Sequence, residues 1–97
     1  MHVLSRSTLM DFWAKNPDSE EALKAWFKEA EHAQWKSFLD IKAHYKSADL
    51  ISDNRVIFNI NHNRFRLIVQ IHYNTGRIFI RFVGTHKEYD RVNPKEV

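Results

Sequence analysis

The segment RVIFNINHNRFRLIVQIHYNTGRIFIRFV, Arg55–Val83, contains three runs rich in β-branched and aromatic residues. The runs RVIFNI, RFRLIVQIHY and RIFIRFV are separated by NHN and NTG, which are turn-forming sequences. A period of two residues within the runs and short turns between them predict a three-stranded antiparallel meander. The N-terminal MHVLS segment is expected to add a fourth strand.

The length of the two turns determines which side chains share a face of this sheet. With an even number of residues in each turn, one face is wholly apolar and helices are expected to cover it. A three-residue turn at Asn74–Gly76 would instead place Arg77 and Arg81 in the core without partners, at a large desolvation cost. Even turns are therefore predicted. The apolar face then comprises Val56, Phe58, Ile60, Phe65, Leu67, Val69, Ile71, Tyr73, Ile78, Ile80 and Phe82.

The opposite face of the predicted sheet mixes arginines with apolar and aromatic residues. Such a surface suits an RNA strand, whose phosphates need positive charge and whose bases need flat surfaces. Its members are Arg55, Asn59, Arg66, Gln70, His72, Arg77 and Arg81, with Ile57, Ile68, Phe79 and Val83 between them.

The N-terminal half has the 3.6-residue apolar spacing of helices. Ser7 is expected to cap a first helix that ends at Asn16-Pro17, and Asp18 with Glu21 forms a capping-box pattern before a second. A shorter third helix is expected after Ser37. The tryptophans are core candidates, but Trp35, between two predicted helices, is the one whose burial the pattern does not support.

These patterns predict an α+β fold in one domain spanning residues 1–97, with a small antiparallel sheet covered on one face by helices. The absence of cysteine excludes disulfides, thiolate chemistry and sulfur-ligated zinc, and it fits a reducing cytoplasm. No apolar run approaches the length of a membrane span, and no secretory signal is recognisable. A cytoplasmic protein without membrane association is therefore expected.

Positive charge is concentrated in the second half of the chain. Residues 1–53 carry 7 Lys and Arg against 9 Asp and Glu, whereas residues 54–97 carry 8 against 3. Six of the seven arginines lie in this basic half. Because arginine grips phosphate oxygens in pairs, an anionic partner is indicated, nucleic acid first. Simple solvation of a sheet by basic residues is an equally good explanation of the charge alone.

A cluster of ionisable residues follows the last strand. Gly84 lets the chain turn, and THKE repeats the capping-box pattern, with Thr85 as the cap and Glu88 three positions on. A helical turn is therefore expected to begin here, at the end of the strand that carries Arg81.

On such a turn His86, Tyr89 and Asp90 lie on one side, at positions i, i+3 and i+4. Histidine and tyrosine can transfer protons, and arginine can neutralise charge that develops on phosphate. This set meets the needs of RNA cleavage without a metal. The alternative is structural: Thr85 and Glu88 only cap, His86 bonds Asp90 on the surface, and Tyr89 covers the sheet edge.

No metal or other cofactor is expected. The six histidines lack the spacing of zinc ligands, no carboxylate pair accompanies them, and no phosphate-binding glycine loop is present.

Several segments resemble the HigB family of toxins from bacterial type II toxin-antitoxin modules, a branch of the RelE/ParE-like superfamily. They are MHVLSRSTLMDFW at the start, WKSFLDIK at Trp35–Lys42, SAD at Ser47–Asp49, RVIFNI followed by NRFRLIV, and RFVGTHKEYD near the end. The last two are the specific ones. The resemblance implies a RelE-like sheet with helices on one face and an mRNA interferase that cuts translated message, usually in the ribosomal A site.

Relatives in the superfamily use sheet arginines and residues at the end of the last strand. By position these match Arg66, Arg81, His86, Tyr89 and Asp90. The sequence therefore leads us to expect a metal-independent endoribonuclease toxin with a separately encoded, HigA-like antitoxin as its partner. Additional contacts to the RNA backbone are expected from Arg64, Arg77, Lys87 and Arg91.

Within the expected site, Arg66 and Arg81 hold the scissile phosphate, His86 and Tyr89 transfer protons, and Asp90 orients His86 or helps as base. Two other functions use the same features. A ParE-like toxin that inhibits gyrase would share the fold and the antitoxin but need no catalytic residues, and a non-enzymatic RNA-binding module would leave RNA intact.

Overall fold

The computed structural model describes all residues from Met1 to Val97 and confirms the α+β class. The elements are β1 (His2–Leu4), α1 (Arg6–Lys15), a 3₁₀ turn (Pro17–Ser19), α2 (Glu20–His32), α3 (Phe38–His44), β2 (Asp49–Ser52), β3 (Arg55–Ile60), β4 (Phe65–His72), β5 (Arg77–Thr85) and α4 (His86–Tyr89). No helix among them is both long enough and apolar enough to span a bilayer.

The five strands form one sheet in the order β1-β5-β4-β3-β2. The β3-β4-β5 meander is antiparallel, as predicted, and its turns at residues 61–64 and 73–76 are both even. The predicted N-terminal strand is confirmed as β1, which pairs in parallel with β5. Strand β2 was not predicted. It pairs antiparallel with β3 and forms that edge of the sheet.

The register between β4 and β5 shifts at one place, within β5. Ile80 pairs with Val69 but Phe82 pairs with Ile68, so Arg81 has no partner on β4. Beyond this bulge Val83 pairs with Leu67 and packs against the core. The predicted faces of Phe82 and Val83 were therefore wrong, because one extra residue in a strand reverses the alternation that follows it.

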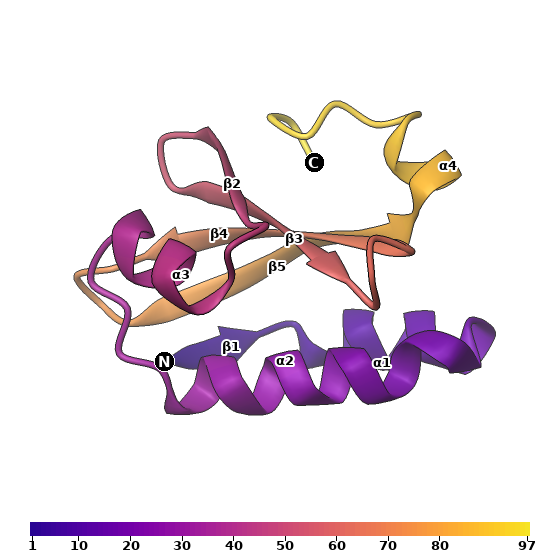
Figure 1. Cartoon of the computed structure of the whole chain (residues 1–97), viewed down its shortest axis with the longest axis horizontal. Helices are drawn as coiled ribbons and strands as arrows, with labels where there is room; N and C mark the ends of the chain where they lie inside the picture. Colours follow the sequence, from indigo (N-terminus) through magenta and orange to yellow (C-terminus); the bar gives the residue numbers. More distant parts are fainter.

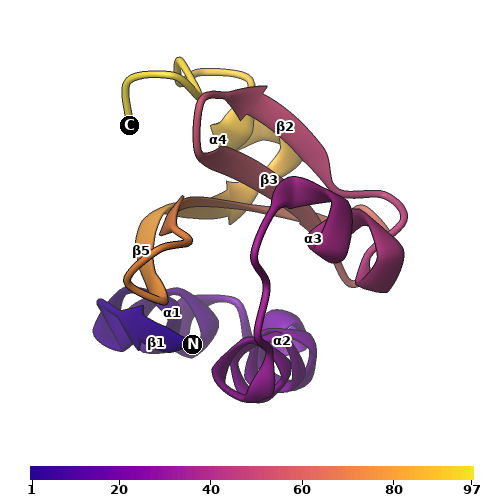
Figure 2. The same ribbon diagram turned by 90° about the vertical axis from the view of Figure 1, so that its left-hand side faces the viewer.

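Helices α1 and α2 cover one face of the sheet (Figures 1 and 2). Leu23, Trp26 and Ala30 on α2 are buried with Phe58 and Leu67 of the sheet in the main hydrophobic core. The expectation for Trp35 was wrong, since it is only 5% exposed. Its ring stacks on Phe58 with centroids 6.1 Å apart, and both residues belong to the main hydrophobic core.

The ends of the helices differ in detail from the prediction. The first helix begins at Arg6 after Ser5, whose φ is 70°, and it ends before Asn16 as expected. The second begins only at Glu20, because Pro17–Ser19 form a 3₁₀ turn and the buried Ser19 hydroxyl donates to the Asn16 carbonyl at 2.7 Å. Neither Ser7 nor Asp18 is the cap residue.

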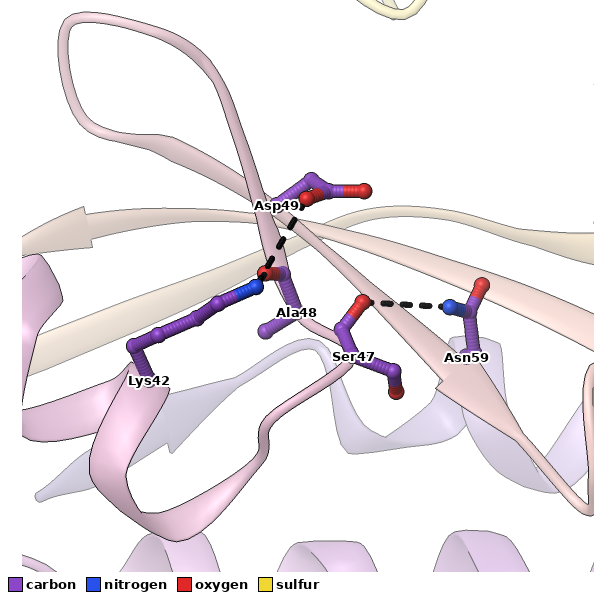
Figure 3. A network of polar contacts seen from close by, with 5 residues as sticks. All are labelled: Lys42, Ser47, Ala48, Asp49 and Asn59. Atoms are coloured by element: carbon purple, nitrogen blue, oxygen red, sulfur yellow. Dashed lines mark hydrogen bonds and ion pairs between the residues drawn. The ribbon is translucent and has the colours of Figure 1, made fainter.

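A small polar network fixes the connection from α3 to β2 (Figure 3). Lys42 Nζ donates to the Ala48 carbonyl at 2.8 Å and lies 3.8 Å from the carboxylate of Asp49. Asn59 Nδ2, on β3, donates to the Ser47 carbonyl at 3.1 Å. The SAD segment is thereby held against the sheet, which aligns β2 as an edge strand.

The C-terminal residues run back over the face of the sheet opposite α1 and α2 (Figure 1). The Arg55 guanidinium donates to the carbonyl oxygen of Val97. Ile57 and Ile68, which the register places on this face, are only 7% and 0% exposed. The face expected to be open to RNA is therefore not open over its whole width.

Candidate active site

A reciprocal cap begins α4 at the end of β5. The Glu88 backbone N–H donates to the Thr85 hydroxyl at 3.3 Å, and the Thr85 N–H donates to the Glu88 carboxylate at 2.8 Å. The predicted capping box is confirmed, and it satisfies two backbone N–H groups at the helix start. The short α4 is thereby fixed in direction relative to the sheet.

Gly84 allows α4 to fold closely against the strand that precedes it. Gly84 is buried, and a Cβ atom there would lie 2.5 Å from the Phe82 ring and 3.1 Å from Cβ of Glu88. A side chain at this position would therefore displace the Phe82 ring, the start of α4, or both. The glycine is needed for space, since its φ is not positive.

Arg66 joins β4 to α4. It pairs with Gly84 across the sheet, and its Nη2 lies 2.6 Å from Nε2 of His86. Its Nη1 donates to the carbonyl of Asn63 at 3.1 Å. The guanidinium carbon also lies 5.9 Å from the centre of the Tyr89 ring, within the range of a cation–π contact. Three residues predicted for the site are thus in contact.

The Arg66 contact assigns a hydrogen-bonding role to Nε2 of His86. A guanidinium has only donors, so Nε2 of His86 must be the acceptor and carry no proton in this contact. This arrangement gives a cation and an imidazole lone pair at one point on the surface.

Arg81 is exposed in the β5 bulge, and no hydrogen bond or ion pair joins it to Arg66, His86 or Tyr89. It lies four residues before Thr85, about 13 Å along the strand at 3.3 Å per residue. A bulge frees a side chain from the ladder and redirects it. Neither Arg66 nor Arg81 is in the helix-covered core, as the even-turn register requires.

Of the other residues predicted for the site, some lie close to α4 and one lies at the opposite end of β5. Asp90 and Lys87 are exposed on or just after α4, and Arg91 follows them. The Asp90 backbone N–H donates to the His86 carbonyl at 3.0 Å, but its carboxylate makes no hydrogen bond to the His86 ring. Arg77 starts β5, about 26 Å of strand away from Thr85.

Arg64 precedes β4 and is already engaged within the protein. Its Nη2 lies 2.6 Å from the Asp18 carboxylate, and its guanidinium lies 5.6 Å from the centre of the Phe65 ring. The side chain is still 60% exposed, so its outer edge faces solvent. An RNA phosphate would compete with Asp18 for this arginine.

The sequence did not reveal the part played by Asn63. Its contribution to the site is a backbone carbonyl, which every residue has, so the residue type alone carries no sign of the contact. Only the NHN sequence could have indicated an unusual turn here, because asparagine tolerates a left-handed backbone better than most non-glycine residues. No group of three His, Cys, Asp or Glu side chains is placed to hold a metal ion.

The fold and the site define a class of small α+β proteins in which a sheet arginine meets a histidine and a tyrosine on the turn after the last strand. A family model described as HigB_toxin, the RelE-like toxic component of a toxin-antitoxin system, matches residues 19–92. The chain belongs to this family of toxins.

Curated relatives agree with this assignment. The mRNA interferase toxin HigB of Escherichia coli K12 is 29% identical over 92 residues, which cover 93% of this chain and 88% of the relative. Proteins named mRNA interferase HigB from Escherichia coli O157:H7 and Shigella flexneri match with the same identity and coverage.

Proposed function

We propose that this toxin is an mRNA interferase that cleaves translated message at the cluster of Arg66, His86 and Tyr89. The contact of Arg66 with both other residues carries the proposal, because it joins a fixed positive charge to two groups able to transfer protons. Membership of the toxin family and the names of the relatives support it.

The proposed reaction uses the RNA's own 2′-hydroxyl as nucleophile and needs no metal. The 2′-oxygen loses its proton to the protein and attacks the adjacent phosphorus, and the bond from phosphorus to the 5′-oxygen breaks. The leaving 5′-oxygen takes up a proton, so the products are a 2′,3′-cyclic phosphate and a 5′-hydroxyl. His86 and Tyr89 exchange these two protons with the substrate, while Arg66 neutralises charge on the phosphorane.

Arg81 and Asp90 complete the proposed catalytic set. The exposed Arg81 precedes α4 on β5, and it would contact a phosphate of the bound RNA and share the negative charge with Arg66. Asp90 follows α4 directly, close enough in the chain to His86 to orient its ring when RNA is bound. Arg64, Arg77, Lys87 and Arg91 would contact the RNA backbone further from the break.

The proposed partners are a HigA-like antitoxin and message on the ribosome, in the cytoplasm. An arginine-rich site suits a protein segment that carries acidic residues, since complementary charges speed association and exclude other partners. Expression with the protein encoded beside the toxin should relieve growth arrest. Arrest that persists in the presence of that protein would count against the partner.

Induction of the toxin followed by mapping of mRNA 5′ ends tests the proposed activity. New ends within translated regions are expected, and they should disappear for a folded Arg66→Ala variant. Intact message with a DNA damage response would instead indicate gyrase inhibition. Intact message without that response would indicate RNA binding alone.

A further inference from the structure

The turn between β3 and β4 has an uncommon backbone. Asn61, His62 and Asn63 have φ values of 53°, 54° and 71°, so three consecutive residues occupy the left-handed region. This region is unfavourable for residues that carry a Cβ atom, although asparagine tolerates it better than most. Such a run persists only where surrounding contacts hold it.

Asp18, in the 3₁₀ turn before α2, supplies those contacts. Asn61 Nδ2 donates to the backbone carbonyl of Asp18 at 3.1 Å, and the Asp18 carboxylate lies 2.6 Å from Nη2 of Arg64. The Arg64 N–H closes the turn by donating to the Asn61 carbonyl at 3.2 Å. Both ends of the turn are therefore tied to one residue of the helical layer.

The far end of the same turn contacts the candidate site. The Asn63 carbonyl accepts from Nη1 of Arg66 at 3.1 Å, while Nη2 of that guanidinium donates to His86. Because the guanidinium is planar, a fixed Nη1 limits the directions in which Nη2 can point. The position of the Asn63 carbonyl depends in turn on the backbone conformation of the turn. Figure 1 shows this turn and α4 at the same end of the sheet.

We propose that the left-handed turn Asn61–Asn63 is a positioning element, and that Asn63 sets the direction from which Arg66 donates to His86. The proposal deepens the proposed function, on which its catalytic part rests. Asn63 is a positioning residue, since its exposed side chain forms no hydrogen bond and only its carbonyl reaches Arg66. Asp18 and Asn61 hold the turn in place.

Two substitutions at one position separate the backbone from the side chain. Asn63→Gly removes the side chain but keeps a left-handed backbone accessible, whereas Asn63→Val strongly disfavours that backbone. Asn74→Val, in the exposed turn between β4 and β5, is the matched control because it makes the same chemical change at the other end of the sheet. If Asn63→Val does not fold, Asn63→Ala replaces it.

Cleavage kinetics give the first measurement. The kcat of Asn63→Val should fall about 10- to 100-fold with a smaller change in KM, because a displaced catalytic group slows the chemical step. The kcat values of Asn63→Gly and Asn74→Val should stay within about twofold of the parental kcat, because neither change disfavours the backbone that places the Asn63 carbonyl. A parental kcat for Asn63→Val would overturn the positioning role.

The second measurement is independent of activity. Imidazole ¹⁵N spectra of the RNA-free protein at a fixed alkaline pH should show Nε2 of His86 unprotonated, with assignment by loss of the signal in His86→Gln. Asn63→Val should move this signal toward that of a ring exchanging between tautomers, and Asn63→Gly should not. Unchanged His86 signals in Asn63→Val would overturn the proposal. If the parent cuts no RNA but these spectra behave as stated, the positioning role stands and the proposed function fails.

Discussion

Arg66 and His86 are 20 positions apart in the chain, yet Nη2 of the arginine lies 2.6 Å from Nε2 of the histidine. Strand pairing of Arg66 with Gly84 accounts for the approach, and the Thr85 cap then turns His86 back over β4. The contact joins a permanent cation to an imidazole nitrogen that accepts its hydrogen bond.

Arg66→Ala should lower the rate of mRNA cleavage about 100- to 1,000-fold, which is the usual cost of removing one charge contact to a transition state. Arg66→Lys should recover little, because a single ammonium group cannot serve both the Asn63 carbonyl and His86 in the planar geometry of the guanidinium. Single-turnover cleavage of a defined message measures the effect. Arg6→Ala, on the helical layer, is the control and should cut at the parental rate.

His86→Ala and Tyr89→Phe should each reduce the cleavage rate about 100- to 10,000-fold if they transfer protons. Arg81→Ala should cost about 100- to 1,000-fold as a charge contact, whereas Arg91→Ala should cost much less. The same single-turnover assay compares the four variants after circular dichroism shows that each is folded. Parental rates for His86→Ala, Tyr89→Phe and Arg81→Ala together would mean that the active site lies elsewhere.

Gly84→Ala should destabilise the protein by about 1–3 kcal/mol, since the new methyl group meets the Phe82 ring and the start of α4. It should also slow cleavage, because α4 carries His86 and Tyr89. Gly76→Ala is the matched control: its φ of 67° makes alanine strained, but no atom lies within 4 Å of the added Cβ. That variant should lose stability in urea unfolding and retain its cleavage rate. Equal loss of activity in both variants would contradict the role of Gly84 in placing α4.

Stability should decrease in alkaline solution through Tyr45. Burial, a hydrogen bond to Glu29 and the charge of Glu29 raise the pKa of the Tyr45 hydroxyl well above its usual value. Above pH ~10 the unfolded chain releases this proton while the folded protein retains it, so the free energy of unfolding falls as pH rises. In urea unfolding, the free energy of unfolding of the parent should fall relative to that of Tyr45→Phe between about pH 9 and 12. A constant difference between the two proteins would mean that Tyr45 is not the source of the alkaline loss.

The parts of the fold that local sequence patterns specify were predictable. The alternation in Arg55–Val83 predicted three strands and their even turns, and THKE predicted the cap of α4 because all of its bonding groups lie within four residues. Trp35 was misjudged because its burial depends on Phe58, which is distant in the sequence. Nothing local marks the β5 bulge at Arg81, because Phe82 and Val83 after it are both apolar and therefore fit either register.

The sequence predicted which residues belong to the candidate site, but it did not predict the contacts between them. His86 and Tyr89 were expected on one side of a helical turn, and the structure shows that Arg66, also predicted for the site, contacts both. The carbonyl of Asn63 was not predictable, because backbone groups carry no residue-specific signal. The catalytic roles of these residues, and those of Arg81 and Asp90, stay predictions.

The central claim, that RNA supplies its own nucleophile at this site, is tested most directly by one substitution in the substrate. A translated message with a single 2′-deoxy nucleotide at the scissile position should bind normally and remain uncut, while the all-ribose message is cleaved to a 2′,3′-cyclic phosphate or its opened 3′-phosphate. Cleavage of the all-ribose message should persist in a chelator when the ribosomes are kept intact by other means. If the deoxy message is cut as fast as the all-ribose one, the 2′-hydroxyl is not the nucleophile and the mechanism is wrong.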